Sequence, residues 1–228
     1  MQQFTTDADA SSIGYIIADD HPATILAISQ ILTDVVGANP SRLISCTNSA
    51  DLLAVCAEPS ICTRVVVLDL TMPGNLKRTA LVRSVTRMNQ GARVLVYTAE
   101  ESMFLARAVL EAGALGYVAK TSQVSELTDA LSAIRAGHRY VDRRIDLDSI
   151  NSHPWSKLTD SERTVLLAFC RGHKASDIVA TTGRSYSTVT THKYNGLSKL
   201  GLKDGSDLLP YIYMNGLLAE LDANPDAS

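Results

Sequence analysis

The chain has 228 residues, of which 46% are hydrophobic and 20% are charged, a composition typical of a globular protein with room for two ordinary domains. The formal net charge is −3, which excludes a uniformly basic nucleic-acid binder. No run approaches the roughly 18 apolar residues that a membrane helix needs, and the polar first residues lack the pattern of a secretory signal. We therefore expect a cytoplasmic protein without a membrane partner.

Residues 13–136 alternate short apolar runs with segments of helical periodicity. The predicted strands are Ile13–Ala18, Arg42–Cys46, Arg64–Leu68, Arg93–Thr98 and Gly116–Lys120. The predicted helices are residues 22–35, Ala50–Ala57, Leu76–Met88, Glu101–Ala112 and Ser125–Ala136. This alternation predicts an α/β domain over residues 12–137, built as a doubly wound, five-stranded parallel sheet of flavodoxin-like size.

The pattern changes after Gly137. Residues 138–155 lack sustained periodicity and are the predicted linker, whereas residues 156–220 contain helical patterns only. In this second part a capping box at Thr159–Glu162 opens one helix, and further helices are predicted over Ala175–Ala180, Tyr186–Leu200 and Ser206–Glu220. A short helix, a turn with Gly and a longer helix predict a small all-α helix-turn-helix domain, followed by a disordered tail at residues 221–228.

The four cysteines carry no function in this interpretation. They lie in apolar surroundings without the close spacing of metal ligands or of a redox pair. They are Cys46, Cys56, Cys62 and Cys170.

Polar side chains follow the predicted strands at their carboxyl ends. Asp19 and Asp20 follow the first strand and Asp69 the third, while Thr98 ends the fourth and Lys120 the fifth. In a parallel sheet these ends meet at one crevice, where clustered carboxylates are stable chiefly around a hard cation such as Mg²⁺. A hydroxyl and an ammonium group beside that site suit a phosphoryl group carried by Asp69.

The motifs of the first domain resemble the receiver domain of bacterial response regulators. They are Asp19–Pro22, Asp69 with Met72–Gly74, Thr98–Ala99 and Gly113–Lys120. The second domain resembles the LuxR-type helix-turn-helix through Leu158, Thr159, Glu162, Ile178, Ser185, Thr188, Val189, His192 and Lys199–Gly201. Together the two domains are similar to the NarL/FixJ subfamily of two-component regulators.

This resemblance implies a transcription regulator rather than an enzyme, with only self-phosphorylation and slow autodephosphorylation as chemistry. A cognate histidine kinase would phosphorylate Asp69. Asp20, Asp69 and the backbone carbonyl of Thr71 would hold Mg²⁺, and Asp19 would act through water.

The resemblance also implies how the phosphoryl group is sensed. Thr98 would contact the phosphoryl group, Lys120 would pair with it, and Tyr117 would turn inward as an aromatic switch when Thr98 moves. The segment Asn75–Arg78 departs from the family, which commonly has Asp-Gly there, so the mobility of this loop and its fit to the kinase are open.

The second helix of the helix-turn-helix is expected to lie in the major groove of double-stranded DNA, with Thr190, Thr191 and Tyr194 facing the bases. The residues expected nearer the phosphates are Arg184, Ser187, His192, Lys193 and Lys199. Gly196 replaces the apolar residue usual there, which we expect to cost about 1 kcal/mol relative to Ala.

A homodimer is expected by resemblance, at least when the chain is phosphorylated. The apolar residues of the last predicted helix form either its seam or part of the core, and both alternatives stay open. They are Leu208, Leu209, Ile212, Leu217 and Leu218.

Three alternatives to this function stay open. The chain could act without phosphorylation, by pairing with another helix-turn-helix protein, or its second domain could be a helical interaction module without DNA. A phosphatase or phosphotransferase with Asp69 as nucleophile is the third alternative, but enzymes of the haloacid-dehalogenase type need a second acid two residues on, where this chain has Thr71.

Overall fold

The computed structural model describes residues 13–59, 63–76, 78–89 and 91–222, and it divides into two compact units. The first unit runs to Glu101 and continues over Ala106–Ile145, and the second comprises Ser102–Leu105 and the chain from Asp146 on. The boundary at Ile145 lies inside the predicted linker. Residues 223–228 of the predicted tail and Cys62 lie outside the described residues.

The first unit is built on a six-stranded sheet with the order β2-β1-β3-β4-β5-β6, and all its neighbouring strands pair in parallel. The strands are β1 (Gly14–Ala18), β2 (Leu43–Cys46), β3 (Arg64–Leu68), β4 (Arg93–Thr98), β5 (Gly116–Ala119) and β6 (Tyr140–Val141). The predicted fold class is confirmed, but the count of five strands was wrong because β6 lies within the predicted linker.

The short strand β6 is held by backbone and side-chain hydrogen bonds. The amide of Tyr140 donates to the carbonyl of Leu115 at 3.0 Å, and the amide of Asp142 donates to the carbonyl of Tyr117 at 2.8 Å. The buried carboxylate of Asp142 accepts from the amide of Ala119 at 3.1 Å and from the hydroxyl of Ser122. Two paired residues are too few to show an alternating pattern, which is why sequence periodicity did not reveal this strand.

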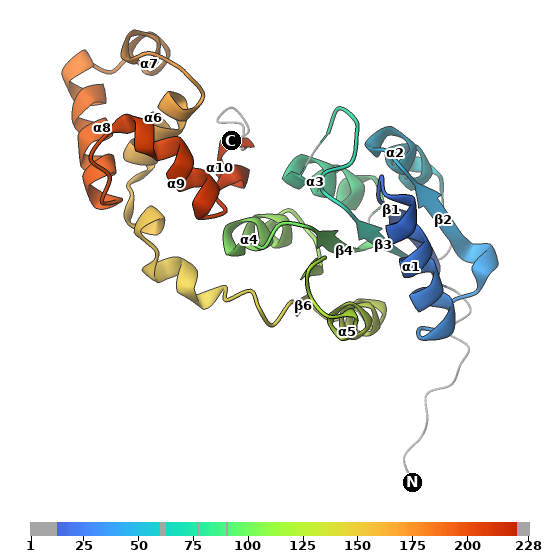
Figure 1. The fold of residues 1–228 in the computed structure, drawn as a ribbon. Helices are drawn as coiled ribbons and strands as arrows, with labels where there is room; N and C mark the ends of the chain where they lie inside the picture. The colour runs from blue at the N-terminus through green and yellow to red at the C-terminus, as the bar shows by residue number, and fades with distance from the viewer. Residues whose placement is uncertain (1–12, 60–62, 77, 90, 223–228) are drawn as a thin grey trace. The chain divides into compact units, whose positions relative to one another are not determined.

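Five α-helices accompany the strands (Figure 1), and each lies within two residues of its predicted bounds. They are α1 (Pro22–Asp34), α2 (Ser49–Ala57), α3 (Arg78–Met88), α4 (Met103–Glu111) and α5 (Val124–Arg135), and a short 3-10 helix, η2, covers Pro40–Arg42. Pro22 occupies the first turn of α1, where its missing N–H costs nothing. Asn48 caps α2 by accepting from the amide of Asp51 at 2.9 Å.

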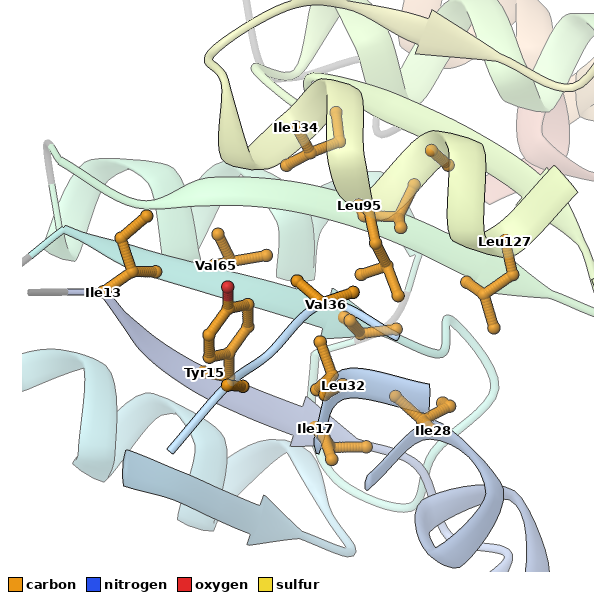
Figure 2. Packing of buried hydrophobic residues seen from close by; sticks show 14 of the residues in the cluster. Ile13, Tyr15, Ile17, Ile28, Leu32, Val36, Val65, Leu95, Leu127 and Ile134 are labelled. Carbon is orange, nitrogen blue, oxygen red and sulfur yellow. The ribbon is translucent and has the colours of Figure 1, made fainter. Parts of the chain in front are cut away.

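The core of this unit lies against the central strands. Every residue of β3 is buried, as expected for a parallel strand covered on both faces. On one side Tyr15 and Ile17 of β1 and Leu95 of β4 pack in one cluster with Leu32 of α1 and Ile134 of α5 (Figure 2). Because the strand interiors are apolar, the polar side chains that can bind a ligand or react lie at the strand ends.

The regular elements of the second unit, over the residues that the structure describes, are all helices. Its elements are η3 (Asp148–Ser152), η4 (Pro154–Lys157), α6 (Asp160–Cys170), α7 (Ala175–Thr182), α8 (Tyr186–Lys199), η5 (Gly205–Asp207), α9 (Leu208–Met214) and α10 (Leu218–Asp222). The predicted capping box is present, since the amide of Thr159 donates to Glu162 at 2.8 Å and the amide of Glu162 donates to Thr159 at 3.3 Å.

The prediction of a single helix over Ser206–Glu220 was wrong. The chain forms α9 and α10 instead, and Gly216 between them has a φ of 63°, a conformation that ends a helix. Leu208, Ile212 and Leu217 are buried in the core of this unit, whereas Leu209 is 43% exposed. Core packing therefore accounts for most of the apolar residues that were considered for a dimer seam.

The expectation for Gly196 also needs correction. Gly196 is buried in α8, and a Cβ atom there would lie 2.8 Å from Cδ1 of Leu166 on α6. Glycine at this position therefore allows α6 and α8 to approach closely, and alanine would be the poorer residue.

Candidate functional site

The side chains predicted to act together follow neighbouring parallel strands. Asp19 follows β1 and Asp69 follows β3, and the amide of Asp69 donates to the carbonyl of Ala18 at 2.8 Å. Thr98 ends β4, and its carbonyl accepts from the amide of Lys120, which follows β5, at 2.7 Å. Because these strands are adjacent and parallel, the fold brings the predicted side chains to one end of the sheet.

Lys120 bridges two buried carboxylates. Its Nζ lies 2.7 Å from Oδ2 of Asp19 and 2.8 Å from Oδ2 of Asp69. The two acid side chains are 2% and 1% exposed, respectively, so their charges need compensation inside the protein. Burial alone would lower the pKa of Lys120, but hydrogen bonds to Asp19 and Asp69 outweigh it and raise this pKa, which keeps the lysine charged.

Four residues around this pocket offer ligand atoms for a metal ion. Asp19, Asp20, His21 and Asp69 each place one such atom within 4.8 Å of the others. Oδ1 of Asp20 is buried and makes no hydrogen bond with any of the described residues, although Nδ1 of His21 lies 2.9 Å away. A buried carboxylate oxygen that still lacks a hydrogen bond fits an oxygen-seeking cation, so the pocket is compatible with a divalent metal.

Two residues next to the acids complete the pocket. The amide and the hydroxyl of Thr71 both donate to Asp69, at 3.3 and 3.0 Å. The amide of His21 donates to Asp19 at 2.9 Å, and its Nδ1 lies 3.2 Å from the same oxygen. Sequence reasoning did not include His21 in the pocket, although its position directly after two acids was the available signal.

The two predicted switch residues are connected through Glu100. Thr98 and Tyr117 are both fully buried. The hydroxyl of Thr98 accepts from the amide of Glu100 at 3.4 Å, and the hydroxyl of Tyr117 donates to the carbonyl of Glu100 at 2.5 Å. Both side chains therefore depend on the same residue of the loop that follows β4.

In the second unit, α8 presents a face rich in hydroxyl groups. Ser185 caps the helix by accepting from the amide of Thr188 at 3.1 Å. Ser187, Thr191 and Tyr194 are exposed, while Thr190 is half-buried and donates back to the carbonyl of Tyr186 at 2.9 Å. Sequence reasoning did not assign Tyr186, Asn195 and Ser198, which are exposed on the same helix.

The predicted phosphate-contacting cations of this unit have partners inside it. Lys199 Nζ lies 2.7 Å from the buried Glu162 carboxylate, and Lys193 Nζ lies 4.5 Å from the ring centroid of Phe169. One guanidinium nitrogen of Arg184 donates to the hydroxyl of Ser161 at 2.9 Å. His192, which was also predicted near the phosphates, is half-buried. Lys199 in particular stabilises the contact between α6 and α8.

The comparison with protein families decides the identity of the chain. Residues 15–132 match the model of the response regulator receiver domain, which is more than half of the sequence. This chain is a response regulator. The predicted membership of the NarL/FixJ subfamily is confirmed by its relatives.

The curated relatives of the response regulator match it over nearly their whole length. It is 25% identical to the response regulator UvrY of Escherichia coli over 213 residues, which covers 90% of this chain and 95% of UvrY. It is 29% identical to the probable transcriptional regulatory protein SgaR of Hyphomicrobium methylovorum over 195 residues, 86% of this chain and 90% of SgaR. It is 26% identical to the transcriptional regulatory protein RcsB of Escherichia coli over 208 residues, 89% of this chain and 94% of RcsB.

Solved structures similar to the response regulator include complexes with DNA. RcsB of Salmonella enterica serovar Typhimurium, bound to a promoter in the presence of the phosphomimetic BeF3−, aligns with a TM-score of 0.65 at 25% identity, covering 88% of this chain and 98% of that one. A structure of two RcsB dimers bound to two parallel DNAs aligns with a TM-score of 0.63 at 25% identity, covering 88% of this chain and 97% of that one.

Among the described helices of the response regulator, none has both the length and the apolar character that a membrane crossing requires.

Proposed function

We propose that this response regulator binds double-stranded DNA to control transcription and is switched by Mg²⁺-dependent phosphorylation of Asp69. The observation that carries the proposal is the Lys120 ammonium group between Asp19 and Asp69, at 2.7 and 2.8 Å. This arrangement keeps a cation beside a buried carboxylate that can attack phosphorus. A helical unit of helix-turn-helix type in the same chain supplies the output.

The transfer is an exchange of one bond to phosphorus for another. An oxygen of Asp69 attacks the phosphorus of the donor, the bond between phosphorus and the leaving group breaks, and an acyl phosphate remains on Asp69. Lys120 neutralises the phosphoryl oxygens, and the hydroxyl of Thr98 donates to one of them. The reaction is stoichiometric, so the chain acts as a switch and not as an enzyme that turns over a phosphate ester.

Mg²⁺ is the cation proposed for the acidic pocket. Asp20 and Asp69, with the backbone carbonyl of Thr71, would hold it, and Asp19 would act through water. When bound, Mg²⁺ would offset the negative charge that gathers on the phosphoryl oxygens during transfer. The buried Oδ1 of Asp20, which accepts no hydrogen bond from the part of the chain that the structure describes, supports this assignment.

The proposed phosphodonor in the cell is a histidine kinase, and the proposed target is DNA bound by a homodimer. The relatives support both the DNA and the dimer, since RcsB is solved as dimers on DNA. The exposed side chains of α8, among them Thr191 and Tyr194, would face the bases in the major groove. Hydroxyl groups rather than cations on this face favour thymine-methyl and water-mediated contacts over direct reading of guanine.

The experiment compares the wild type with Asp69→Asn, using acetyl phosphate and Mg²⁺. We expect the intact mass of the wild type to increase by one phosphoryl group and that of Asp69→Asn to stay unchanged. Asp34→Asn, an exposed acid on α1, is the matched control and should be modified like the wild type. An unmodified wild type would contradict the proposed chemistry.

The output is measured separately, by selecting DNA fragments with and without BeF3− and Mg²⁺. The proposal predicts that the wild type binds the selected DNA fragments more tightly when BeF3− and Mg²⁺ are present. The DNA affinity of Asp69→Asn should not change. Equal DNA binding by both proteins under both conditions would instead support the alternative of a regulator that works without phosphorylation. Selection of no DNA would favour a helical interaction module.

A further inference from the structure

An ion pair joins the start of α3 to the loop that follows β4. Nη1 of Arg78 lies 2.8 Å from both carboxylate oxygens of Glu100. The two side chains are only 17% and 23% exposed, so this pair is screened less by solvent than a surface pair. The partners are 22 positions apart in sequence, and the contact therefore connects the first residue of α3 to the loop that follows β4.

Glu100 is also the residue that connects the two switch side chains. Its amide donates to the hydroxyl of Thr98 at 3.4 Å, and its carbonyl accepts from the hydroxyl of Tyr117 at 2.5 Å. The backbone of Glu100 thus holds Thr98 and Tyr117, while Arg78 holds the side chain of Glu100. Loss of the ion pair should therefore loosen the position of both switch residues, because both are hydrogen-bonded to the backbone of Glu100.

The backbone of Arg78 is in a conformation that this residue type rarely adopts. Its φ is 51°, and among the described residues it is the sole non-glycine with a positive φ. The left-handed region is disfavoured for side chains with a Cβ, so it persists where surrounding contacts stabilise it. Arg78 belongs to the segment after Met72–Gly74 in which this sequence departs from its family.

We propose that Arg78 is a positioning residue of the phosphoacceptor site: its ion pair with Glu100 fixes the loop from which Thr98 and Tyr117 are held. This inference rests on the proposed function, because the positioned groups are those that would contact the phosphoryl group on Asp69. Without Arg78, the carboxylate of Glu100 loses its partner and the loop samples more conformations. The phosphoryl mimic then has to order the loop when it binds, and its affinity falls.

The first test measures the loop directly, in the full chain and without any phosphoryl mimic. Amide hydrogen exchange of residues 98–101 is compared between the wild type, Arg78→Gln and Arg83→Gln. Losing a hydrogen bond between charged groups should accelerate this exchange about tenfold in Arg78→Gln, which corresponds to about 1.4 kcal/mol. Arg83 is exposed on the same helix, so Arg83→Gln has the same change of charge and should behave like the wild type.

The second test measures the affinity for BeF3− in the presence of Mg²⁺. Arg78→Gln and Glu100→Gln should each bind the mimic roughly tenfold more weakly, and the charge-reversed double variant, Arg78→Glu with Glu100→Arg, should recover much of the loss. A general loss of stability would instead accelerate exchange throughout the first unit and would not be rescued by charge reversal.

The outcomes separate this inference from the proposed function. If the wild type does not bind BeF3−, the proposed function fails, and the exchange comparison still decides whether Arg78 positions the loop. If Arg78→Gln does not give a native circular dichroism spectrum, Glu100→Gln, which changes one atom, replaces it. Exchange at residues 98–101 and BeF3− affinity that both equal those of the wild type would overturn the inference.

Discussion

Gly196 shows how one residue sets the distance between two helices. Its position lies over Leu166 of α6, where a Cβ atom would be 2.8 Å from Cδ1 and 3.2 Å from Cγ. These are buried side-chain atoms in the core of the second unit, so they have little room to move. Glycine lowers the stability of an isolated helix, but Gly196 stabilises the packing of α8 against α6.

We predict that Gly196→Ala lowers the free energy of unfolding of the second unit by about 1–2 kcal/mol, because overpacking outweighs the better helix propensity of alanine. Urea unfolding followed by circular dichroism measures the change. Ser198→Ala, at an exposed position of the same helix, is the control and should be neutral or slightly stabilising. Greater stability of Gly196→Ala would show that α6 and α8 do not meet this closely.

Single residues could be predicted from the sequence where topology alone fixes their place. Asp19, Asp69 and Lys120 follow parallel strands, and the strand order puts such positions together whatever the side-chain details. Partners on other helices could not be predicted in the same way. The sequence places Lys199 on a helix, but not opposite the buried Glu162 of α6, because one-dimensional spacing carries no information on which helix faces which.

At the scale of elements, long segments were predictable and short ones were not. Parallel strands such as β3 show continuous apolar runs and α1 has clear periodicity, so their places in the chain were found. The two-residue β6 has no pattern to find. The break between α9 and α10 depends on the conformation of Gly216. Apolar residues lie on both sides of this glycine, so the sequence pattern indicated one continuous helix.

The Asp142 carboxylate connects β6 to the end of β5 and to the loop that carries Lys120, through its hydrogen bonds with Ala119 and Ser122. The free energy of unfolding of the first unit should therefore depend on pH. Burial by itself would raise the pKa of Asp142, but hydrogen bonds from Ser122 and from the amides of Arg144 and Ala119 lower it below its usual value. Because the pKa in the folded state is lower than in the unfolded chain, this carboxylate stabilises the fold fully above the unfolded pKa of about 3.9. That stabilisation is lost as the pH falls through the folded pKa.

We therefore predict that Asp142→Asn lowers the free energy of unfolding of the first unit by about 2 kcal/mol at pH 7, since an amide cannot accept all of these hydrogen bonds. The difference from the wild type should shrink below about pH 4. Urea titrations between pH 3 and pH 7 measure it, with Asp34→Asn as the exposed control. A difference that stays constant over this range would argue against the carboxylate as the stabilising group.

At the scale of the whole molecule, the proposed function combines a phosphoacceptor pocket in one unit with a DNA-contacting helix in the other. The net charge of −3 and the internal partners of Lys193 and Lys199 limit how many cations are available for phosphates. Long-range attraction to DNA should therefore be modest, and specificity should depend on the exposed hydroxyl face of α8.

This distribution of charge gives a prediction for DNA binding. Each phosphate contact contributes about 0.9 to the slope of log affinity against log salt. Lys199→Met should leave this slope unchanged while lowering the stability of the second unit, because its ammonium group pairs with Glu162. Tyr194→Ala should weaken binding at every salt concentration without changing the slope, as a base-facing side chain would. If the slope of log affinity against log salt fell by about 1 in Lys199→Met, this lysine would contact a DNA phosphate instead.

The strand β6 also bears on how the first unit behaves when it is cut from the rest of the chain. A sheet edge with unpaired amides and carbonyls is a template for pairing with other molecules, and natural proteins cover or shorten such edges. Here Tyr140–Val141 lies along the outer side of β5, next to Gly116 and Tyr117. A fragment that stops at residue 137, where the sequence pattern suggested the domain ends, would uncover this side of β5 and lose Asp142, and would be prone to aggregate. A fragment extended to Ile145 keeps this side of β5 paired with β6.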